Sequence, residues 1–194
     1  MSSELGEIDE ALTKKTVERI RPTLMQCYES GLERVAYMGG DIKFFLRVKA
    51  DGQLRWGFVE LTTLGDRQTE TCMLGVLSAT QWPLPDGGEA EVHQSLGFDA
   101  PPGGRVPVEW SPDKVLAAAG KKSLDVASCK KHGPGAFQIT AYVTADHGVG
   151  HIVAAGAAAP SLAAAADVDC ILGVVRSLKL PSPGSAPAKV SFSE

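Results

Sequence analysis

The side chains with the clearest chemical potential in this sequence are its four cysteines: Cys27, Cys72, Cys129 and Cys170. Thiols can form disulfides, bind zinc, act as nucleophiles or simply fill a core as small apolar groups. Their spacing includes no C-x-x-C pair, which argues against a conventional zinc site. Which chemistry applies depends on the elements that hold the four sulfur atoms, so we next examined the organisation of the chain.

The later cysteine of each half, Cys72 or Cys170, begins a closely similar segment. "CMLGVLSATQWPLP" covers residues 72–85 and "CILGVVRSLKLPSP" covers residues 170–183. Before each segment, the chain gives in the same order a helical stretch with the other cysteine, two apolar runs around a glycine turn, and a loop. The same features in the same order in both halves of the chain indicate an internal duplication. We therefore predict two domains, residues 1–98 and 111–194, joined by the Pro- and Gly-rich linker 99–110.

Each copy reads as the same series of elements. In the first copy, apolar residues alternate along 42–48, and Asp51-Gly52 is a typical hairpin turn. Helices are expected within 8–35, with a break at Pro22, and from Cys72 onward. In the second copy, helices are expected over 111–131 and 163–177. The fold class is thus α+β: two tandem α-β-β-α-β domains, each a three-stranded antiparallel sheet with two helices on one side.

In this arrangement the simplest role of the cysteines is one disulfide in each copy, Cys27–Cys72 and Cys129–Cys170. Each bond would join the first helix to the second, and a small domain benefits from such a crosslink. Disulfides persist in oxidising compartments, so this interpretation places the protein outside the cytoplasm. Three alternatives stay open: buried free thiols, a four-thiolate zinc site, and a catalytic thiol at Cys129, beside Lys130, Lys131 and His132.

Other residues give no constellation that favours an enzyme. The histidines His147 and His151 lie four apart but straddle a turn and a strand, so helical metal-ligand geometry does not apply. Asp167 and Asp169, two apart on a helix, do not face each other. We expect no catalytic residues, no metal and no cofactor. A net charge of −4 argues against nucleic-acid binding, and no stretch approaches the roughly 18 apolar residues of a membrane span.

The first copy resembles the TonB C-terminal-like module of the AgmX/PglI type, found in myxobacterial envelope and gliding-motility proteins. The matching segments are "QCYESGLER" at 26–34, "GGDIKFFLRVKADGQL" at 39–54, "ELTTLGDRQTETC" at 60–72, "QWPLPDGG" at 81–88 and "SLGF" at 95–98. The second copy is degenerate, since Lys130 replaces the tyrosine and no tryptophan precedes Leu180-Pro181.

The resemblance implies a periplasmic or cell-envelope protein that binds an envelope protein or peptide segment by adding a strand to a sheet edge. The N-terminal residues lack an apolar signal segment, so export would depend on sequence that this chain does not include. The third strands, near 90–98 and 186–192, are the expected edges. Candidate contact residues are Ala90, Val92, Gln94, Phe98, Val190 and Phe192. Self-association, a spacer with the two sheets paired edge to edge, and a cytosolic thiol-dependent enzyme are the alternatives.

Overall fold

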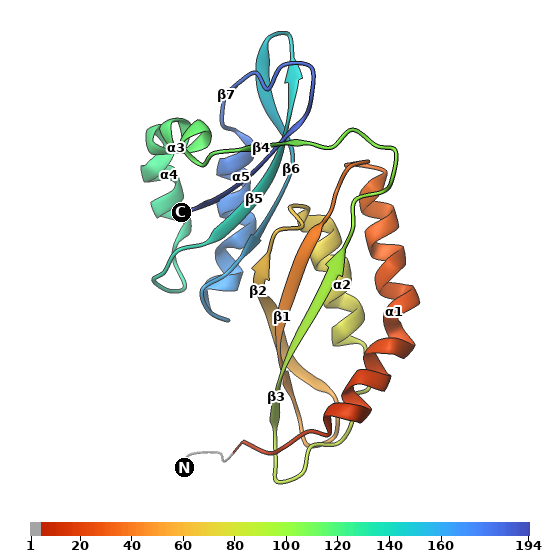
Figure 1. Cartoon of the computed structure of the whole chain (residues 1–194). Coiled ribbons are helices and arrows are strands. Elements are labelled where there is room, and N and C mark those ends of the chain that lie inside the picture. Colours follow the sequence, from red (N-terminus) through yellow and green to blue (C-terminus); the bar gives the residue numbers. More distant parts are fainter. Residues whose placement is uncertain (1–4) are drawn as a thin grey trace.

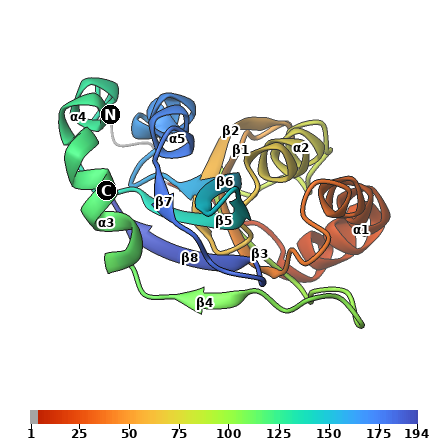
Figure 2. The same ribbon diagram turned by 90° about the horizontal axis from the view of Figure 1, so that it is seen from above.

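The computed structural model describes residues 5–194 and contains two α+β units, one from each half of the chain (Figure 1). The first unit contains α1 (Glu10–Leu32), β1 (Gly40–Val48), β2 (Leu54–Thr62), α2 (Arg67–Ser78) and β3 (Ala90–Phe98). Its three strands form an antiparallel sheet in the order β2-β1-β3, so β1 is central. Seen from above, α1 and α2 lie together on one face of this sheet (Figure 2).

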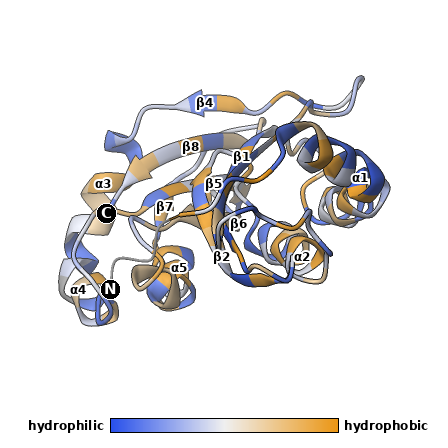
Figure 3. Cartoon of the chain, turned by 90° about the horizontal axis from the view of Figure 1, so that it is seen from below, coloured by the Kyte–Doolittle hydropathy of each residue, from blue (hydrophilic) through white to orange (hydrophobic). Residues whose placement is uncertain are grey.

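The helix α1 runs without interruption through Pro22, so the predicted break is wrong. Asp9 caps the helix, accepting a hydrogen bond from the Leu12 N–H at 2.8 Å. Pro22 is exposed, and the carbonyl that its missing N–H leaves unpaired lies on the same side of the helix, where water can satisfy it. Hydrophilic residues cover much of α1, as expected for a helix that buries only one face (Figure 3).

The second unit has the same core elements but a larger sheet. It contains β4 (Val108–Trp110), α3 (Asp113–Ala119), the 3-10 turn Gly120–Lys122, α4 (Ser123–Cys129), β5 (Gln138–Asp146), β6 (Val149–Ala158), a second 3-10 turn (Ala164–Asp167), α5 (Val168–Arg176), β7 (Leu180–Pro181) and β8 (Ala188–Ser193). The strand order is β4-β8-β5-β6-β7, which gives five strands where the sequence predicted three.

Two differences from the prediction for this unit have local causes. The expected continuous helix over 111–131 is divided into α3 and α4, and the division falls at Gly120, a residue of low helix propensity. The residues 108–110, predicted as part of the linker, form β4 and pair in parallel with β8. The strand β4 is only three residues long, which is too short for an alternating pattern to show, and its partner strand lies eighty residues further along the chain.

The hydrophobic core is divided between the units, and the two halves meet. One cluster is built mainly from the first unit and includes Tyr142, Ala154 and Ala158 of the second. The other is built mainly from the second unit and includes Phe58 of β2. Because each cluster contains residues of both halves, the two units pack against each other and do not hang from a free linker.

Candidate functional site

The cysteines are joined in the two pairs that the repeat predicts. The Cys27–Cys72 bond has an S–S distance of 1.99 Å and links α1 to α2, and the Cys129–Cys170 bond, at 1.97 Å, links α4 to α5. No cysteine is free, so in this state none can bind zinc or act as a nucleophile. Two disulfides favour an oxidising extracytoplasmic compartment.

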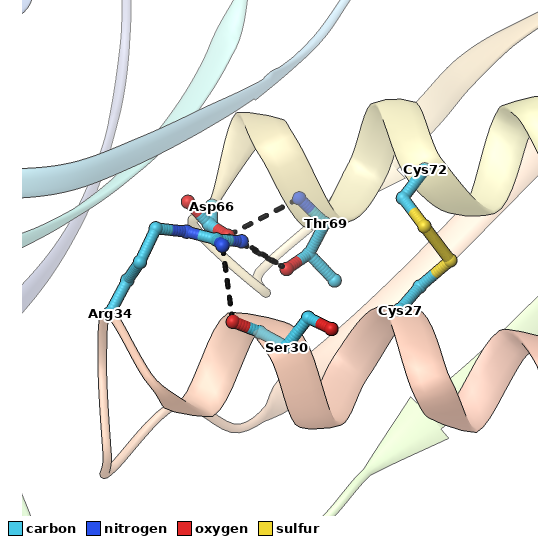
Figure 4. Close-up of a disulfide and its surroundings, with 6 residues drawn as sticks. All are labelled: Cys27, Ser30, Arg34, Asp66, Thr69 and Cys72. Carbon is cyan, nitrogen blue, oxygen red and sulfur yellow. Dashed lines mark hydrogen bonds and ion pairs between the residues drawn. A yellow bond between two sulfur atoms is a disulfide. The ribbon is translucent and has the colours of Figure 1, made fainter.

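Near each disulfide, an aspartate at the start of the second helix is bonded to a residue that follows the helix joined to it. In the first unit, Asp66 caps α2 by accepting from the Thr69 N–H at 3.2 Å, and it forms an ion pair with Arg34 at 2.5 Å (Figure 4). Arg34 follows α1, so this pair ties the end of one helix to the start of the other. The same guanidinium donates to the Ser30 carbonyl at 3.1 Å.

The second unit repeats this arrangement with a histidine. Asp167, at the start of α5, accepts from the backbone N–H groups of Lys131 and His132 at 3.0 and 2.9 Å and pairs with the His132 ring at 2.6 Å. Burial disfavours the charged carboxylate, but the hydrogen bonds from His132 and Lys131 outweigh this and lower the pKa of Asp167. His132, which the sequence places beside the candidate thiol Cys129, thus bonds Asp167 and links the end of α4 to the start of α5.

A buried carboxyl group connects the two units. The Glu70 side chain is fully buried and accepts from the Thr62 hydroxyl at 2.8 Å and from the Ala157 N–H of β6 at 3.3 Å. Burial raises the pKa of Glu70 to about 7. Gly156 permits this approach, since a Cβ at that position would collide with the carboxylate. No sequence pattern pointed to Glu70, because its partner strand belongs to the other unit.

Further contacts across the boundary hold the units in one arrangement. Arg67 of α2 bonds the Asp169 carboxylate of the second unit with two nitrogens, at 2.8 and 3.3 Å. The Lys189 ammonium donates to the Gly39 carbonyl at 2.7 Å. The Ala159 N–H, directly after β6, donates to the Val59 carbonyl of β2 at 3.1 Å, and both residues are buried at this contact.

This packing leaves the third strands in different situations. The strands β3 and β8 belong to different sheets, so the spacer in which these two strands pair is not the observed arrangement. In the second unit, β4 covers β8, with Trp110 opposite Val190 (Figure 2). The prediction of an open edge is therefore wrong along Ala188–Val190. Phe192, the other candidate on β8, lies opposite Ile139 of β5, the strand on the inner side of β8.

In the first unit β3 ends the sheet, and within residues 5–194 no strand pairs with its outer side. The direction of its peptide groups follows from β1. The Asp41 carbonyl accepts from the Thr63 N–H at 2.8 Å and the Asp41 N–H donates to the Thr63 hydroxyl at 2.9 Å, so Asp41 faces β2. Peptide groups of successive residues in a strand face opposite sides. Even-numbered residues of β1 therefore face β3.

The register joins even-numbered residues of β1 to even-numbered residues of β3, as in Phe44 opposite Gln94. The outward peptide groups thus belong to the other set: Glu91, His93, Ser95 and Gly97. The Glu89 carbonyl follows the same alternation and accepts from Gly6, which lies outside the sheet, at 2.8 Å. The sequence-based candidates Ala90, Val92, Gln94 and Phe98 do lie on β3, but their peptide groups bond β1.

A groove of about 860 Å³ runs beside this open edge. One wall is β3, at 91–94, and the other is the first half of α1 together with the segment before it. Its apolar floor contains Ile8, Val17 and Val92. Charged residues of both signs also line it: Lys14, Arg21, Glu7, Glu10, Glu18 and Glu91. An open strand edge beside a groove offers main-chain bonds and a place for side chains, which are the two requirements of strand addition.

The described residues contain no cluster of three or more His, Cys, Asp or Glu side chains that could hold a metal ion. Nor does any described helix have the length and apolar character to cross a bilayer. Comparison of the chain with protein families, with curated proteins and with solved structures finds no match. The geometry of the residues is therefore the basis for assigning a function.

Proposed function

We propose that this protein is a non-catalytic interaction module of the periplasm or cell envelope, and that it binds a partner's extended segment at the open edge of β3. The observation that carries the proposal is the contrast between the two third strands. The β8 edge is already paired with β4. In β3, by contrast, Glu91 and His93 direct their peptide groups outward beside the groove, and Ser95 does so just beyond it. Among residues 5–194, β3 is thus the third strand whose outer side stays unpaired, and we expect one segment to bind there per chain.

Two further observations support this assignment. The first unit has the α-β-β-α-β order of elements that a TonB C-terminal-like module has, and the same resemblance implies an envelope partner. The disulfides and the contacts through Glu70 and Arg67 make the unit rigid, so the edge is held in a binding-ready form and little conformational entropy is lost on association.

The experiment uses Ser95, whose side chain is exposed and whose N–H faces outward. Ser95→Pro removes that donor without touching the bonds to β1, and proline is tolerated at such edge positions. Peptides are first selected from a random display library on the wild-type protein, and their dissociation constants are measured by calorimetry. We expect Ser95→Pro to weaken binding by about tenfold or more, because a main-chain bond is lost and the ring obstructs the added strand.

Ser95→Ala is the matched control, since it removes the hydroxyl but keeps the N–H, and it should bind as the wild type does. Circular dichroism of both variants shows whether the fold is retained. Selected peptides that bind Ser95→Pro and Ser95→Ala equally well would overturn strand addition at β3. A concentration-dependent dimer of the wild type that Ser95→Pro abolishes would instead identify a second copy of this chain as the added partner.

A further inference from the structure

We propose that the groove beside β3 receives a large apolar side chain, an aromatic one above all, from the added segment, in the position that Trp110 occupies in the second unit. This inference rests on the proposed function and specifies the partner of the same site. The chain itself supplies the pattern, because β4 is an extended segment added to a third strand.

The added strand β4 shows how such a segment is held. Val108 bonds the Pro187 carbonyl through its N–H at 2.8 Å, and Trp110 lies opposite Val190. The Trp110 side chain is partly buried against the hydrophobic cluster of the second unit, whereas Val108 is 51% exposed. The aromatic side chain of Trp110 therefore anchors the strand, whereas Val108 contributes a main-chain bond and its side chain stays half exposed.

The strand registers of the two sheets show which residue of β3 corresponds to the residue of β8 that lies opposite Trp110. Leu46 of β1 lies opposite Val92 of β3, and Ala141 of β5 lies opposite Val190 of β8. Val92 and Val190 are each the third residue of their strand, and each stands twenty residues after the second cysteine of its unit, so the two positions are equivalent. A side chain equivalent to Trp110 would thus lie beside Val92, which lines the groove.

The groove suits such a side chain. Val17 and Val92 are 5% and 6% exposed and form apolar floor with Ile8. An aromatic side chain offers roughly 150–250 Å² of surface, and contact with this floor would remove part of it from water. Lys14 and Arg21 line the same groove, and a cation over an aromatic face adds a favourable contact.

The segment that could fill the groove from within the chain takes another path. Trp110 stands three residues before α3, and Glu7 stands three residues before α1, so the two are equivalent in order. Glu7, however, pairs with Asp86 in the turn before β3, and Gly6 bonds Glu89. The described residues before α1 therefore close one end of the groove and leave the edge beyond it open to a partner.

The test uses the chain's own strand as a probe. The peptide of residues 106–112, Val-Pro-Val-Glu-Trp-Ser-Pro, is titrated into the full isotope-labelled protein and followed by NMR. We expect shifts at 91–95 of β3 and along the first turns of α1. The same peptide with alanine in place of tryptophan should bind at least about tenfold more weakly, as truncation of an aromatic anchor does.

Two protein variants locate the anchor. Lys14→Trp places an indole inside the groove and should weaken binding of the peptide by about tenfold or more. Lys15→Trp makes the same change one residue further along α1, outside the groove, and should bind as the wild type does. Thermal melts of both variants show that an effect on binding is not an effect on folding.

Three results would overturn the inference. They are an absence of shifts at millimolar peptide, equal affinity of the tryptophan and alanine peptides, and shifts at 188–190 of β8 in place of β3. If library-selected peptides still lose affinity with Ser95→Pro but ignore Lys14→Trp and carry no aromatic residue, strand addition stands and the aromatic anchor does not. The two proposals can thus fail separately.

Discussion

The buried Glu70 makes the stability of this protein depend on pH in an unusual direction. Its pKa is about 7 in the folded chain, whereas a free glutamate titrates near 4.3. Between these values the folded state binds the proton more tightly than the unfolded state does. The free energy of unfolding therefore falls as pH rises through this window, and above about pH 7 the full cost of the buried charge is present.

The magnitude follows from the difference between the two pKa values. At 1.36 kcal/mol for each pKa unit, the cost is about 3 kcal/mol between pH 4 and pH 8. The carboxyl groups whose pKa values are lowered, Asp167 and Asp169 among them, act in the opposite direction. They lose their stabilising contribution only as pH falls through their folded-state pKa values, below about 4. Between pH 5 and pH 8 these lowered carboxyl groups stay charged, and comparison of the wild type with a variant at position 70 isolates the contribution of Glu70.

The assay is urea unfolding with the disulfides intact, at a series of pH values. Glu70→Gln keeps the shape and still accepts from Thr62 or Ala157, but it has no proton to lose. We expect the wild type to lose about 2 kcal/mol or more between pH 5 and pH 8 relative to this variant. Glu29→Gln, at an exposed position of α1, is the control and should follow the wild type. Parallel pH profiles for wild type and Glu70→Gln would refute the assignment.

Two other changes test the contacts between the units and the covered edge of β8. Gly156→Ala should destabilise the fold by about 1–3 kcal/mol in thermal or urea unfolding, because the added methyl group collides with the buried Glu70 carboxylate. Gly173→Ala, where a Cβ meets nothing within 4 Å, should be neutral or slightly stabilising, and equal effects of the two would contradict this explanation. Val108→Pro removes the N–H that holds β4 on β8, so hydrogen exchange at 188–190 should accelerate and the binding stoichiometry of a β3-binding peptide should rise from one toward two. Val108→Ala keeps that N–H, and if it opened β8 equally, the main-chain bond would not be what holds β4.

Local sequence signals anticipated much of the architecture. Alternating apolar residues gave β1, and Asp51-Gly52 gave the hairpin, because Gly52 adopts the positive φ of +77° that this turn needs. The repeat placed the cysteines on paired helices, which is where the structure joins them. The predicted helix break at Pro22 is wrong, because the effect of a proline depends on which face of α1 is buried, and that is decided by packing.

The candidate site was anticipated only in outline. The third strand was identified as an edge from the order of elements, yet the choice of outward-facing residues required the register with β1. The groove beside β3 depends on how α1 crosses the sheet, so the roles of Val17 and Lys14 had no signal in the sequence.

The sequence alone was enough to predict the repeated order of helices and strands, the hairpins and the most direct pairing of the cysteines, because each of these arises from spacing or from periodicity among residues close along the chain. Only the tertiary structure decided that β4 closes one third strand while the other stays open, and that Glu70 is buried against β6. Both results depend on contacts between residues about eighty or more positions apart. Such contacts form between surfaces that come together only in the folded chain, and local patterns of apolar and polar residues do not predict which surfaces these are.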